Sequence, residues 1–240
     1  MSEPGGHVLV VGASSGIGRA VAARLASGAR ITALARRADR LAELEALGIA
    51  TVAGDVTDLP AIGGIVQAAV AERGLLTGLV YCAGVQVIKP LRSLGVEEVE
   101  RLYRTNLVAP TLFAAAFGSA RVSTRDAVFC AVSSIAAQRP EPAIVPYAAS
   151  KAGLDALIKG LARELAPRRA VAVAPGWLDT EMTQAHARLY GADFKEGLEK
   201  RSPAGAATVD SVVDAIAFLT SPQARHVTGE ILRVDGGAML

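Results

Sequence analysis

The sequence predicts one α/β domain built on an open, mostly parallel sheet with helices on both faces. Apolar runs of strand length recur along the chain, and stretches with helical spacing of Ala, Leu and Val lie between most of them, which is typical of βαβ units. Hydrophobic residues make up 51% of the chain and aromatic residues only 4%, an aliphatic mixture that suits buried parallel strands. The 240 residues are enough for one large core and too few for two.

The expected strands are short and apolar, and most are followed by a helical stretch. Right-handed crossovers between them favour a sheet with helices on both faces, whose ligands bind at the carboxyl ends of the strands. The segment at about 180–206 does not fit the alternation, and we expect it to form a substrate lid. The expected strands cover residues 7–11, 30–35, 49–53, 77–82, 127–133, 170–174 and 230–234.

Charge and hydropathy patterns argue against several classes of function. The net charge of +2 comes from 25 basic and 23 acidic residues that are scattered along the chain, without the basic stripe of a nucleic-acid surface. No apolar run has the length of a membrane span, and the first residues lack the pattern of a secretory signal. Cys82 and Cys130 lie in apolar strand-like runs without metal-ligand spacing. We expect a cytoplasmic protein with packing cysteines, no metal, and neither nucleic-acid nor membrane partners.

A glycine-rich turn follows the first expected strand. Gly12, Gly16 and Gly18 separate that strand from a helix-like stretch beginning at Arg19. Glycine lets the backbone turn tightly and approach a pyrophosphate, whose charge meets the N–H groups of the helix N-terminus. A tight turn without a ligand is the alternative, and the flanking strand and helix weigh against it. The predicted phosphate-binding residues are Gly12, Ser14, Ser15, Gly16, Ile17 and Gly18.

Two arginines follow the second expected strand. This strand ends at Ala35 without the carboxylate that would bind a ribose 2′-hydroxyl, and Arg36 and Arg37 come next. Because arginine matches a 2′-phosphate and an acidic residue would repel it, the sequence favours NADP(H) over NAD(H). Solvated loop arginines are the alternative interpretation.

The third expected strand ends before a short acidic motif. Asp55 and Val56 fall where the adenine amino group of a cofactor would lie. Capping of the next helix by Thr57 or Asp58 is compatible with this assignment.

A serine, a tyrosine and a lysine form the candidate catalytic group, with Asn106 in support. Tyr147 and Lys151 are four residues apart, so both side chains stand on one face of a helix. A phenol has a pKa of about 10, and an adjacent ammonium stabilises its charged form and so adapts it to proton transfer near neutral pH. Ser134 ends the fifth strand, where its hydroxyl could hold a carbonyl oxygen against Tyr147. The alternative, a chance pair with a core tyrosine and a solvated lysine, is disfavoured by the preceding glycine turn and Ser134.

In combination, these motifs resemble the short-chain dehydrogenases/reductases over essentially the whole chain. The likeness also includes the closing stretch 227–237. It implies a Rossmann-type fold in which Tyr147 is the general acid in reduction. Lys151 would bind the nicotinamide ribose and tune Tyr147, Ser134 would orient the carbonyl, and Asn106 would support a water-linked proton relay. Further cofactor contacts are implied for Tyr147 as well as for Ala83, Gly84, Pro175, Gly176, Leu178 and Thr180.

One departure from the family pattern concerns the end of the fourth strand. Tyr81 and Cys82 stand where the family usually has two asparagines. The missing amides normally steady the sheet and the adenosine side, so cofactor affinity is the property that this departure puts in question.

Among family members, the chain looks most like the 3-oxoacyl-[acyl-carrier-protein] reductases. This likeness implies reduction of a β-ketoacyl thioester to the β-hydroxyacyl form in fatty-acid or polyketide-type synthesis. Arg125 and Arg168 match two positions that grip the acidic carrier protein, and basic residues at a cleft mouth would steer such a partner. Ordinary surface arginines are the alternative. Trp177 and Met182 are expected to wall the substrate pocket.

Other interpretations stay open at this point. The substrate is alternatively a free small ketone, secondary alcohol or polyol, or the domain only binds cofactor; the complete catalytic set disfavours the last. The lid residues Met182, Leu189, Tyr190, Phe194 and Leu198 have roughly helical spacing and face either substrate or protein. The likeness also implies a homotetramer, with interfaces on helices at about 95–119 and 147–166 and on the C-terminal strand.

Overall fold

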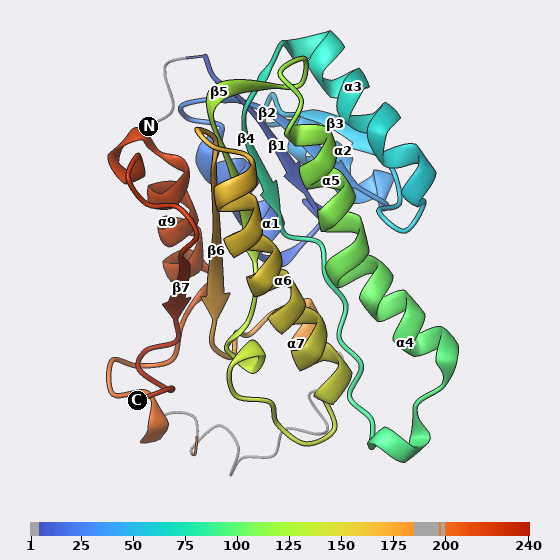
Figure 1. Cartoon of the computed structure of the whole chain (residues 1–240), viewed down its shortest axis with the longest axis vertical. Helices are drawn as coiled ribbons and strands as arrows, with labels where there is room; N and C mark the ends of the chain where they lie inside the picture. The colour runs from blue at the N-terminus through green and yellow to red at the C-terminus, as the bar shows by residue number, and fades with distance from the viewer. Residues whose placement is uncertain (1–4, 185–196, 198–199) are drawn as a thin grey trace.

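The computed structural model describes residues 5–184, 197 and 200–240. In this part of the chain, seven strands form one sheet in the order β3-β2-β1-β4-β5-β6-β7, and every pairing is parallel (Figure 1). The predicted doubly wound α/β fold is confirmed. The strands are β1 (His7–Val11), β2 (Arg30–Ala35), β3 (Ala50–Ala53), β4 (Leu76–Tyr81), β5 (Ser123–Val132), β6 (Arg169–Pro175) and β7 (Ile231–Val234).

Helices cover both faces of the sheet, and successive residues of a strand serve opposite faces. Val8 and Val10 of β1 pack with α1, α2 and α9, whereas Leu9 and Val11 pack with α3, α5 and α6. Figure 1 shows α5 and α6 in front of the strands and α1 behind them. The helices are α1 (Gly16–Leu25), α2 (Ala38–Glu45), α3 (Ile62–Arg73), α4 (Val96–Tyr103), α5 (Ala109–Phe117), α6 (Val145–Glu164), α7 (Glu181–Gln184) and α9 (Val209–Thr220).

The helix expected at about 95–119 is not continuous. Residues Arg104–Val108 form a π-helical turn between α4 and α5. Pro110 has no N–H to donate to the carbonyl of Asn106, four residues earlier, and its ring crowds that carbonyl. Such wide turns often occur at functional sites, and this one contains Asn106.

Part of the expected lid lies outside the described residues. This holds for four of its apolar positions, Leu189, Tyr190, Phe194 and Leu198. The short helix α7 is the described beginning of the segment. Among the helices that the structure describes, none combines the length and apolarity needed to cross a membrane.

His7 is fully buried at the amino end of β1. Its Nδ1 lies 2.8 Å from the carbonyl oxygen of Gly74, and its Nε2 lies 2.9 Å from the hydroxyl of Thr32. Only a protonated nitrogen can donate to a carbonyl, so Nδ1 donates to Gly74 and Nε2 accepts from Thr32. Burial lowers the pKa of His7 below its usual value of 6.5, although the Gly74 contact opposes the shift.

The free energy of unfolding should therefore fall as the pH drops below about 6.5. In this range the unfolded chain takes up a proton at His7 that the folded chain does not, so acid favours unfolding. Stability is fully present above the unfolded pKa and is lost as the pH falls toward the lower folded one. Urea unfolding across this range measures the slope, and His7→Leu should reduce it; an unchanged slope in the variant would assign the acid sensitivity to other groups.

Candidate active site

A cavity of about 1300 Å³ lies at the carboxyl ends of the strands. Residues at or just after the ends of six strands line it: Gly12, Ala35, Gly54, Cys82, Ser133 and Gly176. The strand order reverses between β1 and β4, and the crevice at such a switch point is where open α/β sheets bind ligands. Small-molecule sites usually measure about 300–1,000 Å³. This cavity therefore has room for a dinucleotide and a second molecule.

The glycine turn forms one wall of the cavity. Gly12 has φ +87°, and a Cβ there would lie 2.5 Å from the backbone nitrogen of Ala83. A Cβ on Gly18 would lie 2.2 Å from the carbonyl oxygen of Gly12, so this glycine lets α1 pack against the turn. Gly16 has φ +51° and lines the cavity, and a Cβ there would meet nothing closer than a methyl of Thr180 at 4.0 Å. The three positions match the needs of a tight turn, a close phosphate approach and helix packing.

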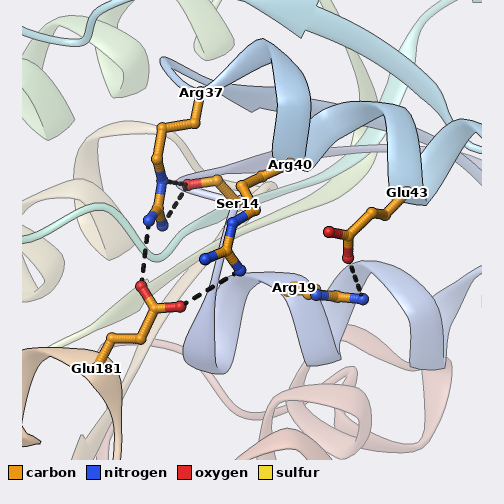
Figure 2. Close-up of polar contacts among 6 residues, drawn as sticks. All are labelled: Ser14, Arg19, Arg37, Arg40, Glu43 and Glu181. Atoms are coloured by element: carbon orange, nitrogen blue, oxygen red, sulfur yellow. Dashed lines mark hydrogen bonds and ion pairs between the residues drawn. The ribbon is translucent and has the colours of Figure 1, made fainter.

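The predicted arginines lie beside this turn. The Arg37 guanidinium donates to the hydroxyl of Ser14 at 3.1 and 3.3 Å and to the carboxylate of Glu181 at 3.1 Å (Figure 2). Arg36 lies 3.7 Å from the carboxylate of Asp55. Both arginines line the cavity. They are placed to meet an anionic group at this end of the cavity.

The Asp55 carboxylate is fixed by hydrogen bonds from Thr57, two residues further along the chain. One carboxylate oxygen accepts hydrogen bonds of 2.8 Å from both the backbone nitrogen and the hydroxyl of Thr57. Burial raises the pKa of Asp55, but these bonds and the nearby charge of Arg36 outweigh it and hold the pKa below its usual value. The carboxylate is thus ionised and oriented near neutral pH. Asp58 precedes the next helical turn without a side-chain cap.

The candidate catalytic residues converge at the other end of the cavity. Ser134, Tyr147 and Lys151 all line it. Ser134 follows β5, and its hydroxyl accepts a hydrogen bond from the Ala136 nitrogen at 3.1 Å, which leaves the O–H to donate to a ligand. Tyr147 and Lys151 come from α6, with the Lys151 nitrogen 5.9 Å from the centre of the tyrosine ring. The predicted group is therefore brought together in space.

Lys151 is buried, and a backbone carbonyl accepts a hydrogen bond from its ammonium. Nζ donates to the Val132 carbonyl oxygen at 2.7 Å. Burial lowers the pKa of Lys151 to about 8, although the charge of Asp155 opposes the shift. Asp155 lies one turn further along α6 and accepts a hydrogen bond from Ser133. Neither Asp155 nor Ser133 was predicted from the sequence; the spacing of Asp155 four residues after Lys151 is the signal that could have indicated it.

Asn106 lies behind the cavity wall. Its side chain is fully buried. The amide oxygen accepts from the Val85 nitrogen at 2.9 Å, while the amide nitrogen donates to the Val85 carbonyl at 2.9 Å and to the Ser150 hydroxyl at 3.0 Å. Ser150 in turn donates to the Tyr147 carbonyl at 2.7 Å. Asn106 thereby ties the loop after β4 to the start of α6, and its side-chain contacts are those of a positioning residue.

Tyr81 fastens β4 to the same π-helical turn. It is buried, and its hydroxyl donates to the Thr105 carbonyl at 2.7 Å. This contact steadies the sheet at the position where the family usually uses amides.

Tyr81→Phe should lower the free energy of unfolding by about 1–3 kcal/mol, because the buried Thr105 carbonyl loses its donor. Since Thr105 precedes Asn106, turnover should fall as well. Denaturant unfolding and steady-state kinetics measure the two effects. Tyr103→Phe removes a hydroxyl that takes no part in this contact and serves as control; equal losses in both variants would contradict the assignment.

The segment after β6 forms the floor between the two ends of the cavity. A Cβ on Gly176 would lie 3.1 Å from the Cα of Asp235, so glycine permits close packing against the chain after β7. The Thr180 backbone nitrogen donates to the Thr183 hydroxyl at 2.9 Å, which orders the start of α7. The other residues predicted to contact cofactor also line the cavity: Ser15, Ile17, Val56, Ala83, Gly84, Pro175 and Leu178.

Arg125 and Arg168 do not lie at the mouth of the cavity. Arg125 is near the beginning of β5, and Arg168 directly precedes β6. Because the strands are parallel, their beginnings lie at the edge of the sheet opposite to the cavity. The Arg168 guanidinium donates to the hydroxyl and carbonyl oxygens of Ser123 at 2.7 and 3.0 Å. Within one subunit, the expected placement of these arginines at the cleft was wrong.

Beyond the glycine turn and the catalytic group, both apolar and charged side chains line the cavity, Arg101 and Arg139 among the charged ones. Trp177 and Met182 line it as predicted. Further apolar lining residues were missed, among them Ile88, Ile144 and Met239, because they come from distant segments without a recognisable motif. Among the described residues, no cluster of His, Cys, Asp and Glu has the geometry of a metal site.

The chain is similar over its full length to known proteins. Residues 12–239 match a family model described as Enoyl-(Acyl carrier protein) reductase. The chain is 33% identical to the 3-oxoacyl-[acyl-carrier-protein] reductase FabG of Escherichia coli (strain K12), covering 99% of this chain and 98% of that protein. It is 35% identical to D-erythrulose reductase of Gallus gallus, covering 100% and 98%. A short chain dehydrogenase from Burkholderia cenocepacia J2315, solved in complex with NADP, superimposes with a TM-score of 0.88 at 31% identity, covering 98% of both chains.

A glycine turn suited to a phosphate and a tyrosine beside a lysine share one cavity, and this arrangement is what an oxidoreductase acting on CH–OH or C=O groups requires. The full-length similarity agrees with this class. The chain belongs to the short-chain dehydrogenase/reductase family.

Proposed function

We propose that the protein is an NADP(H)-dependent ketoreductase. The observation that carries this proposal is the meeting of Ser134, Tyr147 and Lys151 in the cavity that the glycine turn and Arg37 also line. The NADP complex of the Burkholderia cenocepacia relative supports the choice of cofactor. Arg36 and Arg37 support it independently, since guanidinium groups suit a 2′-phosphate.

The residues of the cavity fit such a cofactor. The open face at Gly16 and the serines of the turn would hold the pyrophosphate, Arg37 the 2′-phosphate, and Lys151 the nicotinamide ribose. When bound, the reduced nicotinamide supplies a hydride to the substrate carbonyl carbon.

The side chains then hydrogen-bond and protonate the oxygen of the substrate carbonyl. Ser134 donates a hydrogen bond to it and so fixes its position. Tyr147 donates the proton that converts it to a hydroxyl. The Lys151 ammonium stabilises the tyrosinate left behind, and its contact with the Val132 carbonyl keeps it in place.

As substrate we propose a β-ketoacyl thioester, reduced to the β-hydroxyacyl form and carried on an acyl carrier protein. The similarity to a 3-oxoacyl-[acyl-carrier-protein] reductase supports this choice. The apolar wall formed by Ile144, Trp177 and Met182 suits an acyl chain.

A free ketone, secondary alcohol or polyol is the second candidate substrate. The similarity to D-erythrulose reductase favours it. So does the position of Arg125 and Arg168, because neither lies beside the cavity of its own subunit, where it could bind a carrier protein.

The test is NADPH oxidation by the purified protein with three substrates: acetoacetyl-acyl carrier protein, the same acyl group on a small thiol, and a free hydroxyketone. We expect strong preference for the carrier-bound substrate, and loss of turnover in Tyr147→Phe. Equal turnover of the two thioesters would show that the enzyme does not recognise the carrier protein. Turnover of the hydroxyketone alone would establish the second candidate substrate. Failure of all three substrates with NADPH would overturn the ketoreductase proposal.

We also propose that the protein assembles as a homotetramer, with interfaces on α4, α5 and α6 and on the C-terminal strand. Large apolar side chains are exposed along this side, including Val108 at 40% and Leu112 at 37%. Such exposure often marks an interface. Sedimentation velocity measures the assembled mass, and a monomer would contradict the proposal.

A further inference from the structure

A carboxylate bridges two arginines at the adenosine end of the cavity. The Glu181 oxygens lie 3.1 Å from the Arg37 guanidinium and 3.5 Å from that of Arg40. Figure 2 shows both arginines reaching from the α2 side toward Glu181, which comes from the opposite side. The Ser14 hydroxyl completes the group through its bonds to Arg37.

The bridge joins elements that are remote in the sequence. Arg37 immediately precedes α2, and Arg40 lies within its first turn, so the two side chains share one face. Glu181 is the first residue of α7, 144 positions further along the chain than Arg37. Ser14, Arg37 and Glu181 all line the cavity. The carboxylate therefore lies where the predicted arginine would meet a cofactor.

A phosphate monoester could bind the two arginines in the same way as the Glu181 carboxylate does. A phosphate oxygen anion and a carboxylate bind guanidinium groups through the same paired N–H donors. Both are negatively charged, so they repel each other and cannot share the arginines without cost. Arg40, which the sequence did not indicate, would provide a second guanidinium for the phosphate once Glu181 has withdrawn.

We propose that Glu181 competes with the 2′-phosphate of NADP(H) for Arg37 and Arg40, and thereby sets how strongly the enzyme prefers NADP(H) to NAD(H). The inference rests on the proposed use of NADP(H). NAD(H) has a 2′-hydroxyl in place of the phosphate and leaves the bridge intact. Glu181 is thus a specificity-determining residue that acts by lowering affinity for the phosphorylated cofactor.

The solvent exposure of the three side chains limits how much Glu181 can change the affinity for the phosphorylated cofactor. The side chains of Arg37, Arg40 and Glu181 are 42%, 39% and 50% exposed, so water and salt screen their attraction. An ion pair of this kind changes a binding constant only about two- to five-fold. The effect should shrink as ionic strength rises.

The test compares binding of adenosine 2′,5′-bisphosphate and adenosine 5′-monophosphate by titration calorimetry at low salt. Glu181→Gln should bind the bisphosphate about two- to five-fold more tightly than the parent, with unchanged affinity for the monophosphate. Glu43→Gln is the matched control. Glu43 pairs with Arg19 at 2.7 Å, has 47% exposure and lies close by in Figure 2, but it contacts neither Arg37 nor Arg40.

The outcomes separate this inference from the proposed function. If the parent binds both ligands equally, the use of NADP(H) is wrong, and the inference fails with it. If the parent prefers the bisphosphate but Glu181→Gln binds it no more tightly, only the role of Glu181 is overturned. An equal gain in Glu43→Gln would also overturn it, because the gain would then reflect net charge rather than release of the two arginines.

Discussion

Tyr147→Phe should lower kcat for ketone reduction on the order of 10²–10⁴-fold, because the variant has no proton to give the substrate oxygen. Ser134 remains to position the carbonyl oxygen. The Lys151 nitrogen lies 5.9 Å from the centre of the Tyr147 ring. Steady-state kinetics with NADPH and a ketone measure the loss.

Binding and folding should be unaffected by this substitution. The predicted phosphate contacts lie at the other end of the cavity, so calorimetric titration should give an NADPH affinity close to that of the parent. A kcat within tenfold of the parent would mean that another group donates the proton. A parallel loss of cofactor binding would mean that the hydroxyl holds the cofactor instead.

Lys151→Met should abolish most of the activity without lowering stability. A shift of the lysine pKa from 10.5 to about 8 corresponds to roughly 3 kcal/mol of unfavourable burial of the charge. Methionine has a similar length and does not carry this cost. The Val132 carbonyl loses its donor, which costs about 1–3 kcal/mol. The two effects offset each other, so we expect a variant at least as stable as the parent and slower by about 10²–10⁴-fold.

The pH dependence of stability identifies the cause. Between pH 8 and 10.5 the unfolded chain keeps a proton on Lys151 that the folded chain has released, so the stability of the parent rises with pH in this window. The slope should be smaller in Lys151→Met. Thermal unfolding across the window measures it. A variant that unfolds more easily than the parent at neutral pH would show that the ammonium is a net stabilising group.

The sequence predicted the fold in detail where local pattern decides it. The observed β1 and β2 agree with the expected strands, since each is an aliphatic run between polar or glycine-rich turns. β5 begins at Ser123, four residues before the expected start at 127. These first residues are mostly polar and pair with β4 through an irregular register, so no apolar run marks them in the sequence. The break before α5 was missed, although Pro110 marks it.

The candidate catalytic residues could be selected from the sequence for a related reason. The spacing of Tyr147 and Lys151 and the position of Ser134 at a strand end are local features, and each has a direct chemical meaning. The glycine turn is equally local. Arg125 and Arg168 show the opposite case: their charge can be read from the sequence, but the edge of the sheet to which they belong depends on strand direction.

By itself the sequence determined the succession of strands and helices, the glycine turn and the candidate catalytic set, because the spacing of hydrophobic residues, of glycines and of helix neighbours is a pattern of a few residues. Only the tertiary structure decided which charges meet. Lys151 is buried beside the end of β5, where the Val132 carbonyl accepts its hydrogen bond, and Glu181 reaches Arg37 and Arg40 because α7 returns to the start of α2. Arg37 and Glu181 are 144 positions apart, and no local pattern encodes their contact.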